Sequence, residues 1–117
     1  MITVLFEVTM QPGQRETYLN LAKALVSELE KQDGFISVER FESLTTPDKL
    51  LSLQTWRDEA SVVAWRNNLF HQKTMPIGYQ RLFADYRLRV LNVIRDYGKH
   101  DREQAPTDVS SLQAEQA

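Results

Sequence analysis

The chain has 117 residues, of which 42% are hydrophobic and 26% are charged, and its formal net charge is −2. This length suits one domain with a real core, and so small a net charge does not steer a protein toward nucleic acid or an anionic membrane. No apolar run approaches the ~20 residues of a membrane-spanning helix. The sequence has no cysteine, which excludes disulfides, thiolate nucleophiles and cysteine-ligated metals and fits a cytoplasmic protein.

The first part of the chain predicts a strand followed by a helix. Apolar residues alternate along residues 2–10, which is typical of a strand with one buried face. After the break at QPGQ, helical spacing predicts one buried stripe, formed by Tyr18, Leu21, Ala22, Leu25 and Leu29. The DGF sequence ends this helix, because Gly34 suits the left-handed conformation that often follows a helix.

The middle of the chain predicts a hairpin and a second helix. Residues 35–43 and the segment LLSLQTW read as strands, and the turn LTTPDK between them is short enough for a hairpin. Asp58 or Glu59 then opens a helix, since acidic residues favour its positive end. The buried stripe of this helix is expected to contain Val62, Trp65 and Leu69.

Pro76 interrupts this helix, because proline removes a backbone donor and clashes with the preceding turn. We therefore expect two helical pieces, about 58–69 and about 75–84, the second with a stripe of Met75, Tyr79, Leu82 and Phe83. Residues 85–96 predict a last strand that is apolar on both faces. Residues 98–117 lack aromatic residues and predict a flexible polar tail after a domain of residues 1–97.

The β-α-β-β-α-β order predicts an α+β, ferredoxin-like fold, a four-stranded antiparallel sheet with both helices on one face. The last strand nevertheless carries apolar residues on both sides, with Leu88 and Val90 on one and Leu91 and Val93 on the other. A monomer rarely exposes an apolar patch of that size. We therefore expect a homodimer through the helix-free sheet face, a dimeric α/β barrel.

The segment LLSLQTWRDEASVVAWRNNLFHQ, followed by GYQRLFADYRLRVLNVIRDYG, resembles the antibiotic biosynthesis monooxygenase domain family. The resemblance covers roughly residues 2–97, and its most specific marks are Trp56, the pair Ala64–Trp65, His71 and the last strand. It implies a ferredoxin-like dimer whose sheets pack against each other. Some family members oxidise aromatic polyketide quinols with molecular oxygen and no cofactor, and others bind and degrade heme.

The candidate site lies between the second helix and the sheet. Stripe spacing turns Trp65 inward as core packing, and the resemblance implies that this tryptophan also borders a pocket. His71 is the candidate base, although a lone histidine at a helix end is most often a surface or capping residue. Arg89 could stabilise an anionic oxygen, although a strand arginine is more often solvated or salt-bridged. The expected substrate-binding walls are Trp65, Phe41, Tyr79 and Phe83.

Three functions stay open at this point. The first is a cofactor-independent monooxygenase acting on a small aromatic or quinol substrate, and the second is a non-catalytic dimeric module that binds a small ligand. The third is heme binding or degradation. The resemblance implies that this function needs an asparagine on the first strand, where this chain has Phe6 or Glu7. It also implies an iron ligand near Met75, whereas the histidine of this chain is His71. Because the glycines stand singly, no nucleotide or flavin fingerprint is present, and neither cofactor nor metal is expected.

Overall fold

The structure is a computed structural model that describes residues 1–71 and 79–107, and the side chains of residues 70, 71 and 79 lie outside this description. The elements follow the predicted order. They are β1 (Ile2–Met10), α1 (Arg15–Glu30), β2 (Phe35–Glu42), β3 (Lys49–Trp56), α2 (Glu59–His71), the short 3₁₀ helix η1 (Tyr79–Leu82) and β4 (Phe83–Asn92).

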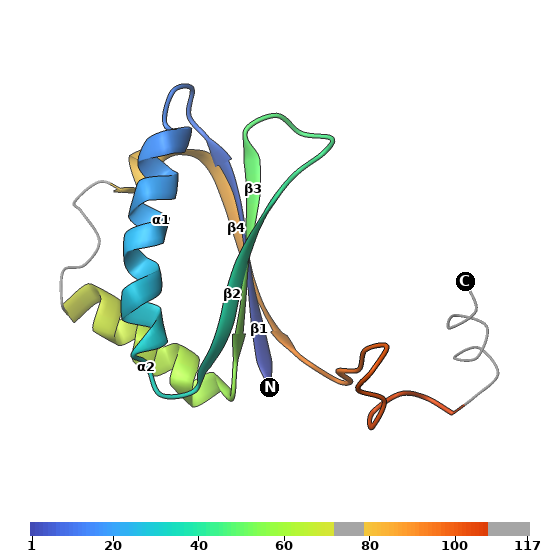
Figure 1. Cartoon of the computed structure of the whole chain (residues 1–117). Helices are drawn as coiled ribbons and strands as arrows, with labels where there is room; N and C mark the ends of the chain where they lie inside the picture. The colour runs from blue at the N-terminus through green and yellow to red at the C-terminus, as the bar shows by residue number, and fades with distance from the viewer. Residues whose placement is uncertain (72–78, 108–117) are drawn as a thin grey trace.

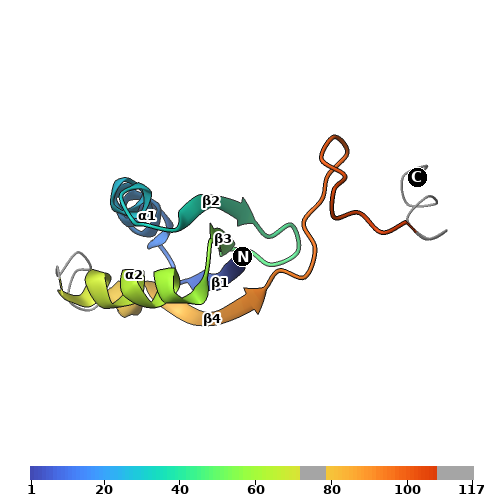
Figure 2. The ribbon, with the colours of Figure 1, turned by 90° about the horizontal axis from the view of Figure 1, so that it is seen from below.

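The strands form one four-stranded antiparallel sheet in the order β2-β3-β1-β4. Both helices lie on the same side of this sheet, and the other side is uncovered (Figures 1 and 2). The predicted ferredoxin-like fold is therefore confirmed. Within the described part of the chain, no helix has the length and apolar character needed to cross a membrane.

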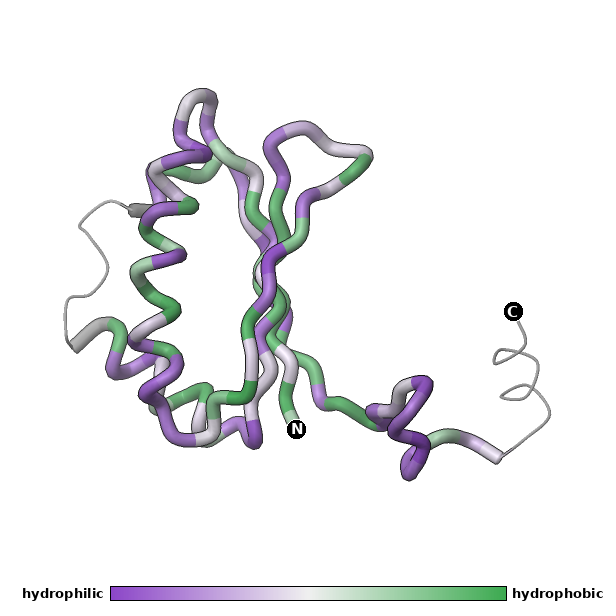
Figure 3. The backbone as a smooth tube through the Cα atoms, in the orientation of Figure 1, coloured by the Kyte–Doolittle hydropathy of each residue, from purple (hydrophilic) through white to green (hydrophobic). Residues whose placement is uncertain are grey.

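The core lies between the helices and the sheet and consists of two clusters of buried side chains. Even-numbered residues of β1 supply both clusters, with Val4 in one and Val8 in the other. The predicted alternation of β1 is therefore confirmed. Figure 3 shows hydrophobic positions recurring along α1 and the strands, whereas the segment after β4 is largely hydrophilic. The clusters are centred on Val8, Met10, Tyr18, Ala22, Leu50 and Phe83, and on Val4, Leu29, Trp56, Val62 and Trp65.

A polar network fixes the start of α2 against the turn that leads into β2. The Asp58 carboxylate accepts hydrogen bonds from the backbone N–H of Ser61 at 2.8 Å and from its hydroxyl at 2.7 Å, and so caps the helix. Arg57 donates to both carboxylate oxygens of Asp33 at 3.0 and 2.9 Å. Gly34 has a φ of +86°, and a Cβ placed there would stand 2.0 Å from the Ser61 hydroxyl oxygen, so this turn requires glycine.

The segment before β4 differs from the predicted helix over about 75–84. Residues 79–82 form only a 3₁₀ turn, and Phe83 opens β4 opposite Met10, next to an irregularity in the register between Thr9 and Met10. Phe83 is part of the sheet because it pairs with Met10 of β1, and this long-range pairing outweighs the local helical spacing. Residues 72–78, including Met75 and Pro76, lie outside the described residues.

β4 ends at Asn92 rather than at residue 96. Residues 93–107 contain no regular secondary structure and run away from the sheet (Figure 1). The Val93 N–H still donates to the Met1 carbonyl at 3.0 Å, and farther along the Arg102 guanidinium lies 5.1 Å from the centre of the Tyr97 ring. The division into a domain and a polar tail stays a prediction, and residues 108–117 lie outside the description.

Candidate ligand cavity between the helices and the sheet

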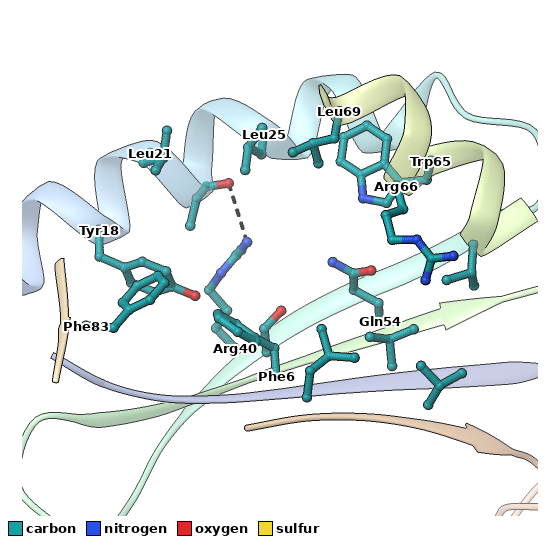
Figure 4. A pocket seen from close by; sticks show the side chains of 16 residues that line it. Phe6, Tyr18, Leu21, Leu25, Arg40, Gln54, Trp65, Arg66, Leu69 and Phe83 are labelled. Carbon is teal, nitrogen blue, oxygen red and sulfur yellow. Dashed lines mark hydrogen bonds between the residues drawn. The ribbon is translucent and has the colours of Figure 1, made fainter. Parts of the chain in front are cut away.

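A cavity of about 300 Å³ lies between the two helices and the covered face of the sheet (Figure 4). Its walls come from α1, α2 and every strand of the sheet, so the whole fold contributes to its shape. The lining residues are Val4, Phe6, Tyr18, Leu21, Ala22, Leu25, Arg40, Ser52, Gln54, Val62, Trp65, Arg66, Leu69, Phe83, Leu88 and Val90.

The apolar stripe of α1 forms one long wall of the cavity. Of the predicted stripe, Tyr18, Ala22 and Leu29 are buried, but Leu21 and Leu25 are only half-buried. Both leucines line the cavity instead of closing against the sheet. Part of the surface that the helical pattern marks for burial is thus available to a ligand.

Aromatic rings close two ends of the cavity. At one end the ring of Phe83 packs edge-on against Tyr18 and Phe6, with centroids 5.6 and 5.7 Å away. At the other end Trp65 of α2 is buried and lies 6.4 Å from Trp56, centre to centre, at an angle of 31°. These packed rings give the cavity rigid ends.

The cavity opens beside β4, the edge strand of the sheet. Leu88 and Val90 line it, yet 54% and 47% of their surfaces are exposed. Arg66, which also lines the cavity, is exposed. The exposed part of the lining therefore lies on β4 and α2.

Arg40 is the charged group that reaches deepest into this apolar space. It lies on β2 opposite Ser52 of β3, and Figure 4 shows its guanidinium standing between the sheet and α1. One terminal nitrogen donates to the Ala22 carbonyl at 3.4 Å, which is long for a hydrogen bond. The Nε atom is buried and has no hydrogen-bond partner among the described residues.

Two uncharged polar side chains, Gln54 and Ser52, also line the cavity. The Gln54 side-chain oxygen accepts a hydrogen bond from the Trp56 indole N–H at 3.0 Å. Ser52 is buried at 5% exposure. None of the described residues that line the cavity is acidic, so its charged groups are Arg40 and Arg66.

The structure places two of the predicted site residues at this cavity. Trp65 and Phe83 both line it. The side chains of His71 and Tyr79 lie outside the described residues, and only their backbones are placed, at the end of α2 and the start of η1.

Phe41 and Arg89 lie on the opposite, uncovered face of the sheet. Side chains alternate along a strand, so Arg40 points toward the helices and Phe41 points away. The same alternation separates Arg89 from Leu88 and Val90. A guanidinium nitrogen of Arg89 instead lies 3.5 Å from a carboxylate oxygen of Glu7. The same oxygen is 3.9 Å from the Lys49 ammonium nitrogen.

Sequence reasoning missed Arg40. The signal was present in β2, where Val38 and Arg40 alternate on the face that meets α1, but we assigned no faces to this strand. Phe6 also lines the cavity, and it is one of the two residues, with Glu7, that stand near the single asparagine position of the heme-degrading pattern.

The comparisons with known proteins agree with this fold. The sequence profile of the family described as antibiotic biosynthesis monooxygenase matches residues 1–76. A protein of Pyricularia oryzae named jasmonate monooxygenase is 46% identical over 90 residues, which are 77% of this chain and 42% of that protein. The chain thus spans less than half the length of this curated relative.

Two solved structures share the fold at low sequence identity. Rv0793 from Mycobacterium tuberculosis superimposes with a TM-score of 0.71 and 16% identity, covering 83% of this chain and 98% of that one. A mutant of MhuD, crystallised with two manganese protoporphyrin IX molecules per active site, superimposes with a TM-score of 0.70 and 12% identity, covering 84% of this chain and 99% of that one. The profile match and the identity to the curated relative both point to one family: the chain belongs to the antibiotic biosynthesis monooxygenase family.

Proposed function

We propose that this chain is an oxygenase domain that oxidises a small, largely apolar molecule with molecular oxygen inside the cavity. The observation that carries the proposal is the cavity itself, about 300 Å³ of mostly apolar and aromatic surface with a few polar groups. Small-molecule sites have this character and begin at about this volume. The relative named jasmonate monooxygenase supports an oxygenase function and makes jasmonate one of the first compounds to test.

The chemistry that best fits an apolar site is oxidation in which the substrate supplies its own electrons. An activated CH₂ group of a quinol-type substrate loses a proton, and the resulting carbanion reduces oxygen. One oxygen atom becomes the carbonyl of the product, and the other leaves as water with the two hydrogens of that carbon. The protein then has to orient the ring, assist the first deprotonation and exclude bulk water.

In this proposal the side chains that line the cavity bind and orient the substrate. Trp65 and Phe83 hold the ring of the substrate, with Tyr79 as a further wall and His71 as the base that accepts the proton. The Phe41 and Arg89 side chains face away from the cavity, so we assign them no part in the reaction.

We also propose a homodimer through the uncovered face of the sheet. β1 and β3 place Leu5 opposite Leu53, and β2 adds Phe41, which is 44% exposed. Leu91 of β4 lies on the same face and is 39% exposed. A second copy would cover these side chains and surround Glu7 and its two cations with protein.

The experiment that tests the oxygenase function is turnover under isotopically heavy oxygen gas. The full chain is incubated with a panel of quinols and with jasmonate, and the masses of the products are measured by mass spectrometry. Incorporation of one heavy oxygen atom per product molecule, with matching oxygen uptake, supports the proposal. Tight binding without oxygen uptake would make the chain a binding module instead.

A further inference from the structure

We propose that the molecule bound in this cavity carries a carboxylate, which the Arg40 guanidinium holds, so that the substrate class is a small apolar acid. This inference rests on the proposed function, because it names what the same cavity takes. It does not depend on the chemistry that follows binding.

The first support is the unsatisfied donor on Arg40. Among the described residues, its Nε atom is buried without a partner, and the hydrogen bond from its terminal nitrogen to the Ala22 carbonyl is 3.4 Å long. Leaving a buried charged donor unpaired costs more than a typical hydrogen bond contributes. A carboxylate satisfies such a group well, because the planar guanidinium fork matches its two oxygens.

The second support is the sign of the charge at the cavity. The chain as a whole carries a net charge of −2, yet the described cavity lining holds Arg40 and Arg66 and no acidic residue. Three other arginines of the described chain, Arg15, Arg57 and Arg89, have a carboxylate within 4.0 Å, for example Arg15 with Glu42 at 2.8 Å. Neither cavity arginine has a carboxylate within 4.0 Å among the described residues.

The positions of the two arginines fit a small acid bound in the cavity. Arg66 is an exposed lining residue on α2, where a cation attracts anions from solution, whereas Arg40 is half-buried on β2. Leu21, Leu25 and Leu69 line the remaining wall and would hold the hydrocarbon body of the ligand. Ser52 pairs with Arg40 across β2 and β3 and also lines the cavity, so its hydroxyl is a further polar group there.

The test compares matched pairs of ligands that differ in one charge. The probes are jasmonate with methyl jasmonate and naphthoate with methyl naphthoate, and the dissociation constants for the full chain are measured by calorimetry or by NMR titration. We expect each acid to bind about tenfold or more tightly than its ester, the ratio that a charge-assisted hydrogen bond gives.

Variants then assign the preference to one residue. Arg40→Gln should bring acid and ester to equal affinity while leaving the affinity for the ester within about twofold. Arg40→Lys keeps the charge but loses the fork, so part of the preference should remain. Arg95→Gln, which changes an exposed arginine beyond the end of β4, is the matched control and should bind like the wild type.

The outcomes separate this inference from the proposed function. Equal affinity for acid and ester in both pairs, or no binding of either acid, overturns the inference even if Arg40→Gln does not fold, because the wild type alone decides it. An acid preference that survives Arg40→Gln also overturns it. An acid preference that Arg40→Gln removes, without oxygen uptake, supports the inference while the oxygenase function fails. Oxygen uptake together with equal affinity for acid and ester supports the oxygenase function while the inference fails.

Discussion

The indole rings of Trp56 and Trp65 lie 6.4 Å apart and join the end of β3 to the middle of α2. Trp56 is completely buried, whereas Trp65 is 8% exposed because it also borders the cavity. One ring therefore belongs only to the core, and the other serves both the core and the ligand site.

Replacing Trp65 by alanine should lower the free energy of unfolding by about 3–5 kcal/mol, the usual cost of deleting a buried large aromatic side chain. Urea unfolding monitored by circular dichroism measures the loss. Trp65→Phe keeps an aromatic wall and should lose much less. A loss well below 1 kcal/mol for Trp65→Ala would mean that the ring contributes little to the core.

Gly34→Ala should destabilise the domain by more than the about 1–2 kcal/mol that left-handed backbone costs an L-residue. The added Cβ would stand 2.0 Å from the Ser61 hydroxyl oxygen and 2.6 Å from the Ser61 Cβ, so either the turn or α2 has to shift. Gly13→Ala is the matched control, because Gly13 also has a positive φ, +77°, but has open space around it. Equal losses of unfolding free energy in the two variants would show that the Ser61 contact has no energetic role.

Acid should destabilise the domain because it protonates Asp58, whose carboxylate caps α2. Hydrogen bonds from the Ser61 hydroxyl and backbone N–H, followed by the Arg57 guanidinium, lower the pKa of Asp58 from 3.8 to about 2. A lowered pKa in the folded state stabilises the protein above the ordinary value, and this stabilisation disappears as the pH falls from about 3.8 toward about 2. Arg57 likewise lowers the pKa of Asp33.

Thermal melts across this pH range check the acid prediction. Asp58→Asn should melt at a lower temperature near neutral pH and should change less than the wild type as the pH falls. Ser61→Ala removes one donor to Asp58, which moves the folded-state pKa of Asp58 back toward 3.8, so this variant should lose less stability than the wild type as the pH falls. A wild-type melting temperature that stays constant from pH 3.8 to about pH 2 would contradict the assigned pKa of Asp58.

Phe41→Asp should convert the proposed dimer into a monomer. Phe41 lies on the uncovered face of the sheet, where a charge would have to be buried without a partner in the dimer. Sedimentation at micromolar concentration measures the mass of the assembly. Leu44→Asp, at a fully exposed position in the β2–β3 turn, is the control and should leave the mass unchanged. A monomeric wild type at these concentrations would refute the dimer.

His71→Ala should abolish oxidation of a quinol that the wild type turns over, with little loss of stability. The reason is that histidine suits proton transfer near neutral pH and follows Trp65 on the same helix. Oxygen uptake measured over a range of pH is the readout. His100→Ala, which changes the other histidine, in the exposed segment after β4, should behave like the wild type. Unchanged turnover and an unchanged pH profile in His71→Ala would leave this histidine without a chemical role.

The sequence predicted the fold well where one periodicity dominates. The alternation of β1 and the stripe of α2 through Val62 and Trp65 reflect burial against a single partner surface, and local patterns record that directly. Phe83 was wrongly placed in a helix, because its conformation depends on pairing with Met10, which is 73 positions earlier in the chain. A local pattern does not carry that information.

The cavity could be predicted only in part. Trp65 was assigned to a pocket wall through the resemblance, and its stripe position agrees. The half-burial of Leu21 and Leu25 could not be predicted, because a helical stripe looks the same whether the facing layer fills the space or leaves it open. Arg40 was missed for a different reason, since a single arginine in a strand reads as a solvated side chain until the register shows which face it occupies.

The central place of β1 has a consequence for how this chain is synthesised. Ile2 pairs with Trp56 on one side and with Asn92 on the other, so β1 is synthesised before both of its partners and stays unpaired on one edge until β4 follows. Such an edge readily recruits strands from other chains. A fragment that stops at residue 76, where the family profile ends, would keep β1 open and would lack Phe83, Leu88 and Val90. A working fragment of this domain therefore has to extend through β4.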